Sequence, residues 1–575
     1  MSTLSLLFIF LNVLFSRVAG LWPIPRSLST GNTPVKLSPT FSIQFASDFA
    51  QGTAGIPQDL LEAIERTEMY LHNDTFERLV VGRGKTDAKV LPTAIQVHSL
   101  RLTLTEKARL RSIAEEATST IDEKMQEGIE SYALKVPEFG GGRDGGVAML
   151  QANTSLGLLR GLQTFGQMWY AYEGTKYLLN APIEIEDGPA FPYRGFSFDT
   201  SRNFYPIADI LRTLDAMSWV KLNILYWHII DSQSFPLEVE AFPELSAKGA
   251  YSSEEVYSLK DVDTIVKYAN ARGIDVIMVE LDSPGHTTAV SFAHPEHVAC
   301  ANKSPWSRYA SEPPAGQLRI ASNQTVAFVK DMFGSVAKRL PGRMMSSGGD
   351  EVNLACWEED EETSEELRAK NQTIAEALNV FVEEVQGELK ENGKTPFIKS
   401  DMILTHNVPV TNDTVAVVWQ SSEDAVRMAQ RGIRFIHQPS NFFYLDCRGG
   451  EWLGNDVLGN SWCDPFKTWQ RAYSFDPHAN LTTEETRLVL GGQMPLWSEQ
   501  SSGENLDSIV WPRLGAGAEV FWTGEVLPDE VNATSGGNAF LRLNELRYRL
   551  VDRNVRAIAL QPKWCVLRPG ECDLN

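Results

Sequence analysis

Two adjacent carboxylates, Asp350 and Glu351, follow two adjacent glycines in the stretch 344–353, which reads MMSSGGDEVN. In an extended strand neighbouring side chains point to opposite faces, so both carboxylates serve one pocket only if the chain turns there. Gly348 and Gly349 permit such a turn. When two carboxyls lie in different environments, one can stay protonated as a general acid while the other stays charged. The pair therefore suggests acid–base catalysis, although an acidic pair after glycines is more often a solvated turn.

The elements that must position this pair are eight short apolar runs, which begin near residue 193 and alternate with helical stretches. This alternation is typical of βα units with parallel strands. Eight such units favour a (β/α)8 TIM barrel with insertions over an open sheet. The predicted strands are RGFSFD near 194, LNILYWHII near 222, DVIMVEL near 275, RMMSS near 343, PFIKS near 396, VAVVW near 415, FIHQP near 435 and VLGGQMPLW near 489.

Polar and aromatic residues follow or close these runs. Because active sites of such barrels lie where the strands end, we expect these residues to share one rim. Carboxylates accept hydroxyl protons and aromatic faces pack on C–H surfaces, so the combination is typical of a sugar pocket. The residues are Asp231, the stretch 282–286 with His286, Asp350, Glu351, Trp419, Gln420, Tyr444, Leu445, Asp446, Trp497, Ser498 and Glu499.

The sequence before the barrel predicts a smaller α+β domain over residues 21–188, without chemistry of its own. The stretches 94–104, 131–136 and 146–152 have the pattern of strands, and the segment 106–134 begins as a helix. Leu158, Leu162 and Phe165 have helical spacing and are expected in the core. The stretch 183–192, IEIEDGPAFP, resembles a join between domains, and the barrel domain is assigned to 189–575.

The composition excludes some partners. The 575 residues are 43% hydrophobic and include 14 Trp, which is ample material for two cores. A net charge of -22 argues against a nucleic acid or an anionic membrane, because either would need a basic face. A neutral substrate is compatible with this charge.

Residues 1–20 are predicted to be a secretory signal peptide. They contain the apolar run LSLLFIFLNVLF before Val18, Ala19 and Gly20, although a basic first region is missing. The expected destination is the medium, the cell wall or the vacuole. Eight Asn-X-Ser/Thr acceptors agree with export, namely Asn73, Asn153, Asn302, Asn323, Asn371, Asn412, Asn480 and Asn532.

Six cysteines suit an oxidising compartment. Cys565 and Cys572 are close enough to close a small loop. Six cysteines allow 15 connectivities, among which the preferred remaining pairs are Cys300 with Cys356 and Cys447 with Cys463. No Cys or His spacing suggests zinc, so neither a metal nor another cofactor is expected.

With these residues laid out, the chain resembles the glycoside hydrolase family 20 β-N-acetylhexosaminidases, particularly the secreted fungal type. The resemblance covers the barrel from Arg194 to about Trp564, and the preceding domain resembles the usual N-terminal domain of the family. It is carried by the strings YRGFSFDTSRNF, KLNILYWHIIDSQSFPLEV, DVIMVELDSPGHT, PPAGQLRIASNQT, SSGGDEVNLACW, FFYLDC and LWSEQ.

The resemblance implies an exo-acting enzyme that retains the anomeric configuration. In this family the 2-acetamido oxygen of the substrate attacks the anomeric carbon, an exception to the scheme with two enzyme carboxylates. Glu351 is then the general acid and later the base, and Asp350 orients the acetamido N–H. The implied substrate is terminal β-linked N-acetylglucosamine, with N-acetylgalactosamine as a second sugar, on chitooligosaccharides or glycoconjugates. A homodimer is the expected assembly.

The same resemblance assigns the substrate-binding residues. Tyr444 donates its hydroxyl to the acetamido oxygen, while Trp419 and Trp497 wall the methyl group. Asp231 and His286 fix Glu351. The residues for the sugar hydroxyls are Arg194, Asp446 and Glu499, although Arg194 opens its strand, whereas Asp199 and Arg202 lie at the end that barrel chemistry prefers.

The sequence departs from the family at the acetamide pocket. Residues 398–402 read IKSDM, so Lys399 stands where the family has a third Trp. An ammonium cannot pack on a methyl group as an indole does, and burying it unpaired is costly. We expect Lys399 either to turn outward or to pair with a carboxylate such as Asp401. Smaller departures are Tyr226, Ser232 and Ser346.

Two competing functions remain open. The first is a family relative whose altered pocket binds aminosugars with weak or no turnover, as Lys399 would suggest. The second is a metal-dependent barrel hydrolase, which the nine histidines and the lack of an HxH pair do not favour.

Overall fold

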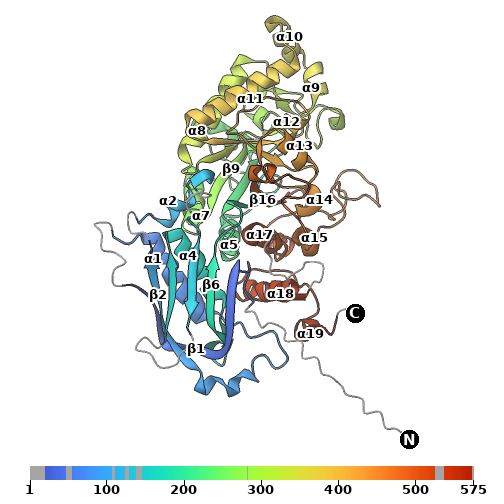
Figure 1. The fold of residues 1–575 in the computed structure, drawn as a ribbon. Coiled ribbons are helices and arrows are strands. Elements are labelled where there is room, and N and C mark those ends of the chain that lie inside the picture. The colour runs from blue at the N-terminus through green and yellow to red at the C-terminus, as the bar shows by residue number, and fades with distance from the viewer. Residues whose placement is uncertain are drawn as a thin grey trace.

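The computed structural model describes residues 20–46, 55–105, 110–123, 128–137, 146–281, 283–524 and 537–572. These residues form a sheet domain and a barrel domain that lie end to end (Figure 1). The first domain is formed by most of the chain before residue 188. The barrel carries the predicted rim at the end away from the sheet domain.

The first domain is a six-stranded mixed sheet in the order β1-β2-β4-β3-β6-β5, in which β1 also pairs with β6. Helices α1 and α4 bury apolar faces in the core of this domain. Leu158, Leu162 and Phe165 lie in that core, as predicted. The elements are β1 Ser27–Phe45, α1 Gln58–Asn73, β2 Ile95–Leu104, α2 Ile113–Ala117, β3 Tyr132–Val136, β4 Val147–Ala152, α4 Ser155–Gln167, β5 Tyr170–Tyr172 and β6 Thr175–Asp187.

Two expectations for this domain need correction. In the predicted helical segment 106–134, the described residues form the short helix α2, a further helical turn at 121–123 and β3. Helix α2 begins with a capping box of Ser112 and Glu115. Residues 106–109 and 124–127 lie outside the described residues. The stretch 183–187 is the end of β6, because Ile183 and Ile185 alternate into the core. The join is therefore only the segment between β6 and residue 193.

The barrel is an eight-stranded parallel sheet in the order β12-β13-β14-β15-β16-β7-β8-β9. Strands β9 and β12, at its two edges, lie next to each other, so the barrel is nearly closed. Each strand coincides with a predicted run, and the fold class is confirmed. The strands are β7 Tyr193–Asp199, β8 Ile224–Ile230, β9 Asp275–Leu281, β12 Met344–Ser346, β13 Thr395–Lys399, β14 Val415–Val418, β15 Arg434–His437 and β16 Val489–Leu496.

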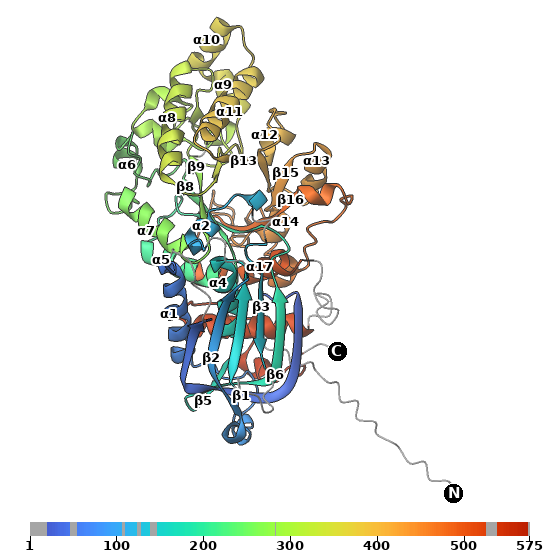
Figure 2. The same cartoon turned by 60° about the vertical axis from the view of Figure 1, so that its left-hand side comes forward.

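Helices follow the strands and surround the barrel (Figures 1 and 2). Helix α7 illustrates why they form, because Ser258 and Asp261 make a capping box and the buried residues have helical spacing. The main helices are α5 Ile207–Trp219, α6 Glu244–Gly249, α7 Leu259–Asn270, α8 Asn323–Arg339, α9 Leu354–Glu359, α10 Glu361–Lys370, α11 Ile374–Glu391, α12 Ser400–Leu404, α13 Asp424–Gln430, α14 Ser440–Phe443, α15 Trp469–Tyr473, α16 Leu506–Val510, α17 Arg513–Thr523, α18 Gly537–Asp552 and α19 Lys563–Val566.

One buried cluster contains side chains from each of the eight barrel strands. Alternate residues of a barrel strand point inward, so this cluster is the packed interior of the barrel. Ile121 of the first domain joins the cluster. The first domain therefore contributes a side chain to the core beneath the active-site rim.

The two domains share further core residues. Trp22, before the first strand, packs in the barrel core, and its indole N–H donates to the carbonyl of Gly515 in α17. Helix α18 lies beside the sheet domain (Figure 1) and contributes Leu543 and Leu546 to the barrel core. Its Glu545 accepts a hydrogen bond from Tyr170 of β5. The C-terminal helix thus contacts both domains.

The covalent and surface features agree with several expectations. The three predicted disulfides are present, Cys300–Cys356, Cys447–Cys463 and Cys565–Cys572. Seven of the predicted glycosylation acceptors are exposed, and Asn532 lies outside the described residues, as do residues 1–19 of the predicted signal peptide. None of the helices in the described ranges combines the length and the apolar character that a membrane span needs.

Candidate active site

The turn that carries Asp350 and Glu351 follows β12 directly. Gly348 and Gly349 have φ of 72° and 108°, and Glu351 itself has φ of 53°. A side chain at Gly349 would collide with Met402, because its Cβ would lie 2.6 Å from the Met402 Cγ. The backbone of Lys399 at the end of β13 donates to the carbonyl of Gly348, 3.0 Å away. The glycines therefore allow both carboxylates to reach one cavity, as the sequence suggested.

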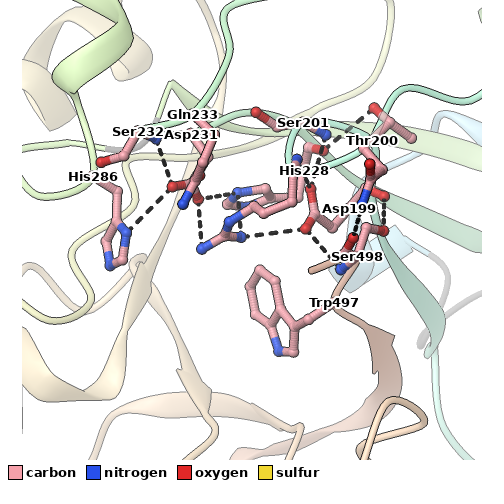
Figure 3. Close-up of polar contacts among 12 residues, drawn as sticks. Asp199, Thr200, Ser201, His228, Asp231, Ser232, Gln233, His286, Trp497 and Ser498 are labelled. Carbon is pink, nitrogen blue, oxygen red and sulfur yellow. Dashed lines mark hydrogen bonds and ion pairs between the residues drawn. The ribbon is translucent and has the colours of Figure 1, made fainter. Parts of the chain in front are cut away.

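Glu351 is held by a chain of hydrogen bonds. His286 Nε2 lies 3.1 Å from Glu351 Oε2, and His286 Nδ1 lies 3.3 Å from Asp231 Oδ1. His228 Nε2 lies 2.8 Å from the other oxygen of Asp231. Glu351, His286 and Asp231 follow β12, β9 and β8, and His228 lies within β8, so three strand ends build this series of hydrogen bonds. Figure 3 shows Asp231 between the two histidines. A carboxylate on one imidazole nitrogen fixes the tautomer that faces Glu351.

Arg202, which follows β7, neutralises the carboxylates behind this chain. Its guanidinium lies 2.8 Å from Asp231, 2.7 Å from Glu312 and 3.4 Å from Asp199. The guanidinium carbon lies 5.2 Å from the ring centroid of Trp497. Burial opposes the charge on Asp231, but Arg202 and the histidines outweigh it and hold the pKa of that carboxyl well below its usual range.

A cavity of about 310 Å³ opens beside Glu351. Its size is at the lower end for small-molecule sites, and its walls combine aromatic rings with a few charged groups. Tyr444 is buried, and burial raises the pKa of its phenol, so the hydroxyl remains a hydrogen-bond donor. The lining residues are Arg202, His286, Ser311, Glu312, Asp350, Glu351, Trp419, Tyr444, Trp452, Leu453, Trp462, Trp497 and Glu499.

Lys399 lies beside this cavity and contacts two of its lining residues. Its ammonium lies 3.1 Å from Asp350 Oδ2 and 5.1 Å from the ring centroid of Trp497, and the side chain is buried. Of the two expected alternatives, pairing with a carboxylate is confirmed and the outward orientation is not seen. The partner is Asp350 rather than Asp401. The ion pair and the indole face compensate for the buried charge.

Asp401 instead supports the turn and one aromatic wall. It accepts hydrogen bonds from the indole N–H of Trp419 and, over 3.4 Å, from the backbone N–H of Glu351. Burial and the nearby charge of Asp350 raise the pKa of Asp401 to about 7. Trp419 is therefore oriented by a carboxyl group that changes charge near neutral pH.

The two predicted hydroxyl-binding carboxylates lie on one side of the site. Glu499 lines the 310 Å³ cavity, whereas Asp446 lines an adjoining cavity. Burial raises the pKa of Asp446 to about 7 and also raises the pKa of Glu499, even though Arg202 favours the charged form of Glu499. Protonated carboxyls can donate as well as accept hydrogen bonds, which suits hydroxyl ligands.

The prediction that Arg194 binds a sugar hydroxyl is wrong. Arg194 lies at the start of β7 and is fully buried against the first domain, where its guanidinium is 2.5 Å from Glu130 Oε2. Glu130 also binds Arg160 of α4, 2.7 Å away. Arg202 occupies the cavity instead, and the signal for it was its place just after the strand end. The prediction also missed Glu312, which no strand pattern marks.

Two of the smaller departures from the family pattern, Tyr226 and Ser346, contact each other. Tyr226 donates its hydroxyl to Ser346 over 3.1 Å, so two of these departures form one hydrogen bond inside the barrel. The backbone of Ser232 donates to Asp231, 2.6 Å away. Asp282, from the predicted rim, lies outside the described residues.

A TIM barrel whose strand ends gather paired carboxylates, a histidine relay and indole rings around one cavity defines a carbohydrate-cleaving enzyme class. Residues 191–525 match the model of the glycosyl hydrolase family 20 catalytic domain, and residues 21–168 match a domain described as beta-acetyl hexosaminidase like. The chain belongs to glycosyl hydrolase family 20.

Similar proteins agree with this assignment. The chain is 30% identical to a beta-hexosaminidase of Arthroderma benhamiae over 98% of both chains. It is 33% identical to a chitooligosaccharidolytic beta-N-acetylglucosaminidase of Ostrinia furnacalis, over 77% of this chain and 75% of the relative. The crystal structure of an exo beta-N-acetylglucosaminidase from Vibrio harveyi with N-acetylglucosamine shares the fold, with a TM-score of 0.71 and 20% identity over 95% of this chain and 79% of that one.

Proposed function

We propose that the protein hydrolyses terminal β-linked N-acetylhexosamine, above all N-acetylglucosamine from chitooligosaccharides, by substrate-assisted catalysis. The observation that carries the proposal is the hydrogen-bonded series Asp231–His286–Glu351, which lies beside Asp350 in a cavity walled by indoles. Relatives named for β-hexosaminidase and chitooligosaccharide activity support the substrate class.

In the first step Glu351 protonates the leaving oxygen while the acetamido oxygen of the substrate attacks the anomeric carbon. Asp350 accepts the acetamido N–H and faces the positive charge that develops on the acetamide. Tyr444 donates to the acetamido oxygen and so directs it toward the anomeric carbon. In the second step Glu351 removes a proton from water, which opens the oxazolinium-like intermediate. Two displacements on the same carbon retain the β configuration.

His286 positions Glu351 for both of its proposed roles, general acid and general base. It bonds to Oε2 of Glu351 and is itself oriented by Asp231, so the carboxyl keeps one position through both proton transfers. Arg202 and Glu499 are the proposed contacts for hydroxyls of the same sugar, because both line the cavity. Arg202 takes the role that the sequence had assigned to Arg194.

The direct test is Glu351→Gln on p-nitrophenyl N-acetyl-β-glucosaminide. We expect a loss of roughly 10²- to 10⁴-fold in kcat, the usual worth of general acid–base catalysis. Glu358→Gln, an exposed carboxyl in α9, is the matched control and should keep its activity. Proton NMR of the first product should show the β anomer. Near-normal rates in Glu351→Gln would refute the role of Glu351.

The second candidate is an aminosugar-binding protein with weak turnover. The observation that favours it is the ion pair of Lys399 with Asp350, because a neutralised Asp350 stabilises a cationic intermediate less well. Tight binding of N-acetylglucosamine in calorimetry without release of p-nitrophenol would select this function.

The proposed site of action is outside the cytoplasm, in the medium, the cell wall or the vacuole. The disulfides and the exposed acceptor asparagines support it. The shift in mass after treatment with an N-glycosidase would test glycosylation, and size-exclusion chromatography with light scattering would test the proposed homodimer.

A further inference from the structure

A second cavity of about 630 Å³ adjoins the catalytic cavity and is twice as large. The two share the residues Trp452, Leu453, Trp462, Trp497 and Glu499, so they are neighbours across a common wall. Apart from Asp446, the residues that line only the larger cavity have no role in the proposed exo reaction.

The second cavity lies away from the reacting bond. Among the described residues that line it are none of Asp350, Glu351, His286 and Tyr444, which mark the leaving oxygen and the acetamide. Glu499 and Asp446, the carboxyls assigned to sugar hydroxyls, both line it. In a pyranose the hydroxyls on C4 and C6 lie across the ring from C1. The second cavity thus begins where the non-reducing end of the bound sugar lies.

The walls of the second cavity suit a neutral sugar. Trp452, Trp462 and Phe466 offer aromatic faces that are partly exposed, by 42%, 66% and 37%. Asn460 and Gln500 add amide groups, and charges of both signs are present, so no ionic ligand is favoured. Like the catalytic cavity, the second cavity combines aromatic faces with a few hydrogen-bonding groups.

The loop that builds this wall is covalently closed. Residues 447–463 carry Trp452, Asn460 and Trp462 between the half-cystines Cys447 and Cys463. Tyr444 meets Trp462 edge to face with ring centroids 5.4 Å apart, which ties the loop to the catalytic cavity. The disulfide and this ring contact therefore hold the wall of the second cavity in place at the rim of the barrel.

We propose that the second cavity binds a neutral sugar residue joined to the C4 or C6 oxygen of the sugar in the catalytic cavity, so that the enzyme also releases disaccharides. This inference rests on the proposed function. In such a turnover Glu351 protonates the leaving oxygen, and the acetamide oxygen of the sugar in the catalytic cavity displaces it from that sugar's own anomeric carbon. One water, deprotonated by Glu351, then opens the intermediate at the same carbon. The products are an intact disaccharide and the leaving alcohol.

The test uses p-nitrophenyl β-chitobioside and chromatography of the first products. Release of intact chitobiose with p-nitrophenol is expected beside the exo products, N-acetylglucosamine and its p-nitrophenyl glycoside. The variant Asn460→Trp narrows the second cavity and should lower disaccharide release at least tenfold. Its rate on p-nitrophenyl N-acetyl-β-glucosaminide should stay within twofold, which also shows that the variant folds.

The matched control is Asn455→Trp, an exposed position in the same loop that lines neither cavity. It should leave both rates unchanged. Exo products alone from the wild type, or unchanged disaccharide release in Asn460→Trp, would overturn the second site while the proposed function stands. No turnover of the monosaccharide glycoside would instead overturn the proposed function, and the second site with it.

Discussion

Replacing Lys399 with Met should increase turnover on N-acetyl-β-glucosaminides. The substitution removes an ammonium that lies 3.1 Å from Asp350 Oδ2 and fills the same volume with an apolar side chain. During the reaction a positive charge develops on the acetamide beside Asp350, and it would lie roughly 5 Å from the ammonium. At an effective dielectric constant of about 20, the repulsion between two unit charges at this distance is about 3 kcal/mol. Its removal corresponds to roughly a hundredfold in kcat as an upper limit.

The measured gain should be smaller than this limit, because the ammonium also compensates the buried negative charge of Asp350. We therefore expect an increase of about tenfold in kcat. Steady-state kinetics on p-nitrophenyl N-acetyl-β-glucosaminide would measure it.

The matched control is Lys394→Met at the other end of β13. This lysine is also buried, but its ammonium donates to the backbone carbonyls of Leu340 and Gly342. Its loss should lower stability without raising kcat. If Lys399→Met instead lowers kcat, the ammonium assists the reaction and the electrostatic reasoning is wrong.

Three further predictions concern groups around the site. Asp401 has a pKa of about 7 in the folded chain, whereas an aspartate in the unfolded chain has a pKa of about 4. The folded state therefore binds this proton more tightly, and its stability should fall as the pH rises between these values. In Asp401→Asn, the Tm should depend less on pH in this range. Arg202→Met leaves buried carboxylates uncompensated and should cost about 3–5 kcal/mol in urea unfolding and most activity. Glu130→Gln should cost a similar free energy, because it leaves Arg160 and Arg194 unpaired at the domain interface, but the KM of the folded enzyme should stay unchanged.

The sequence predicted the barrel well because its signals are local. Each strand is a short buried run, and the residues that build the site follow directly after such runs, as Asp231 and Trp419 do. Position along a strand also decides which end of the barrel a side chain reaches. Arg194 lies at the start of β7 and reaches Glu130 of the first domain, whereas Arg202, just after the end of β7, reaches the cavity.

The features that the sequence did not reveal depend on contacts between distant segments. Asp401 is only two residues from Lys399, so the sequence favours it as the partner, whereas Asp350 comes close to Lys399 only because β12 pairs with β13. Glu312 reaches Arg202 from a long connection without a strand pattern. Residues 183–187 resemble a linker in sequence because the outward side of this strand is acidic. That they form a strand becomes evident only from their pairing with β3.

The indole of Trp22 prevents a clean separation of the two domains. Because it is inserted among the helices of the barrel, a fragment that starts at residue 189 would have an empty hole beneath α17 and exposed apolar surface around it. Ile121 would leave a second hole at the base of the barrel. Cutting the gene between the two domains should therefore yield an aggregating product, and the catalytic half is obtainable only together with the sheet that precedes it.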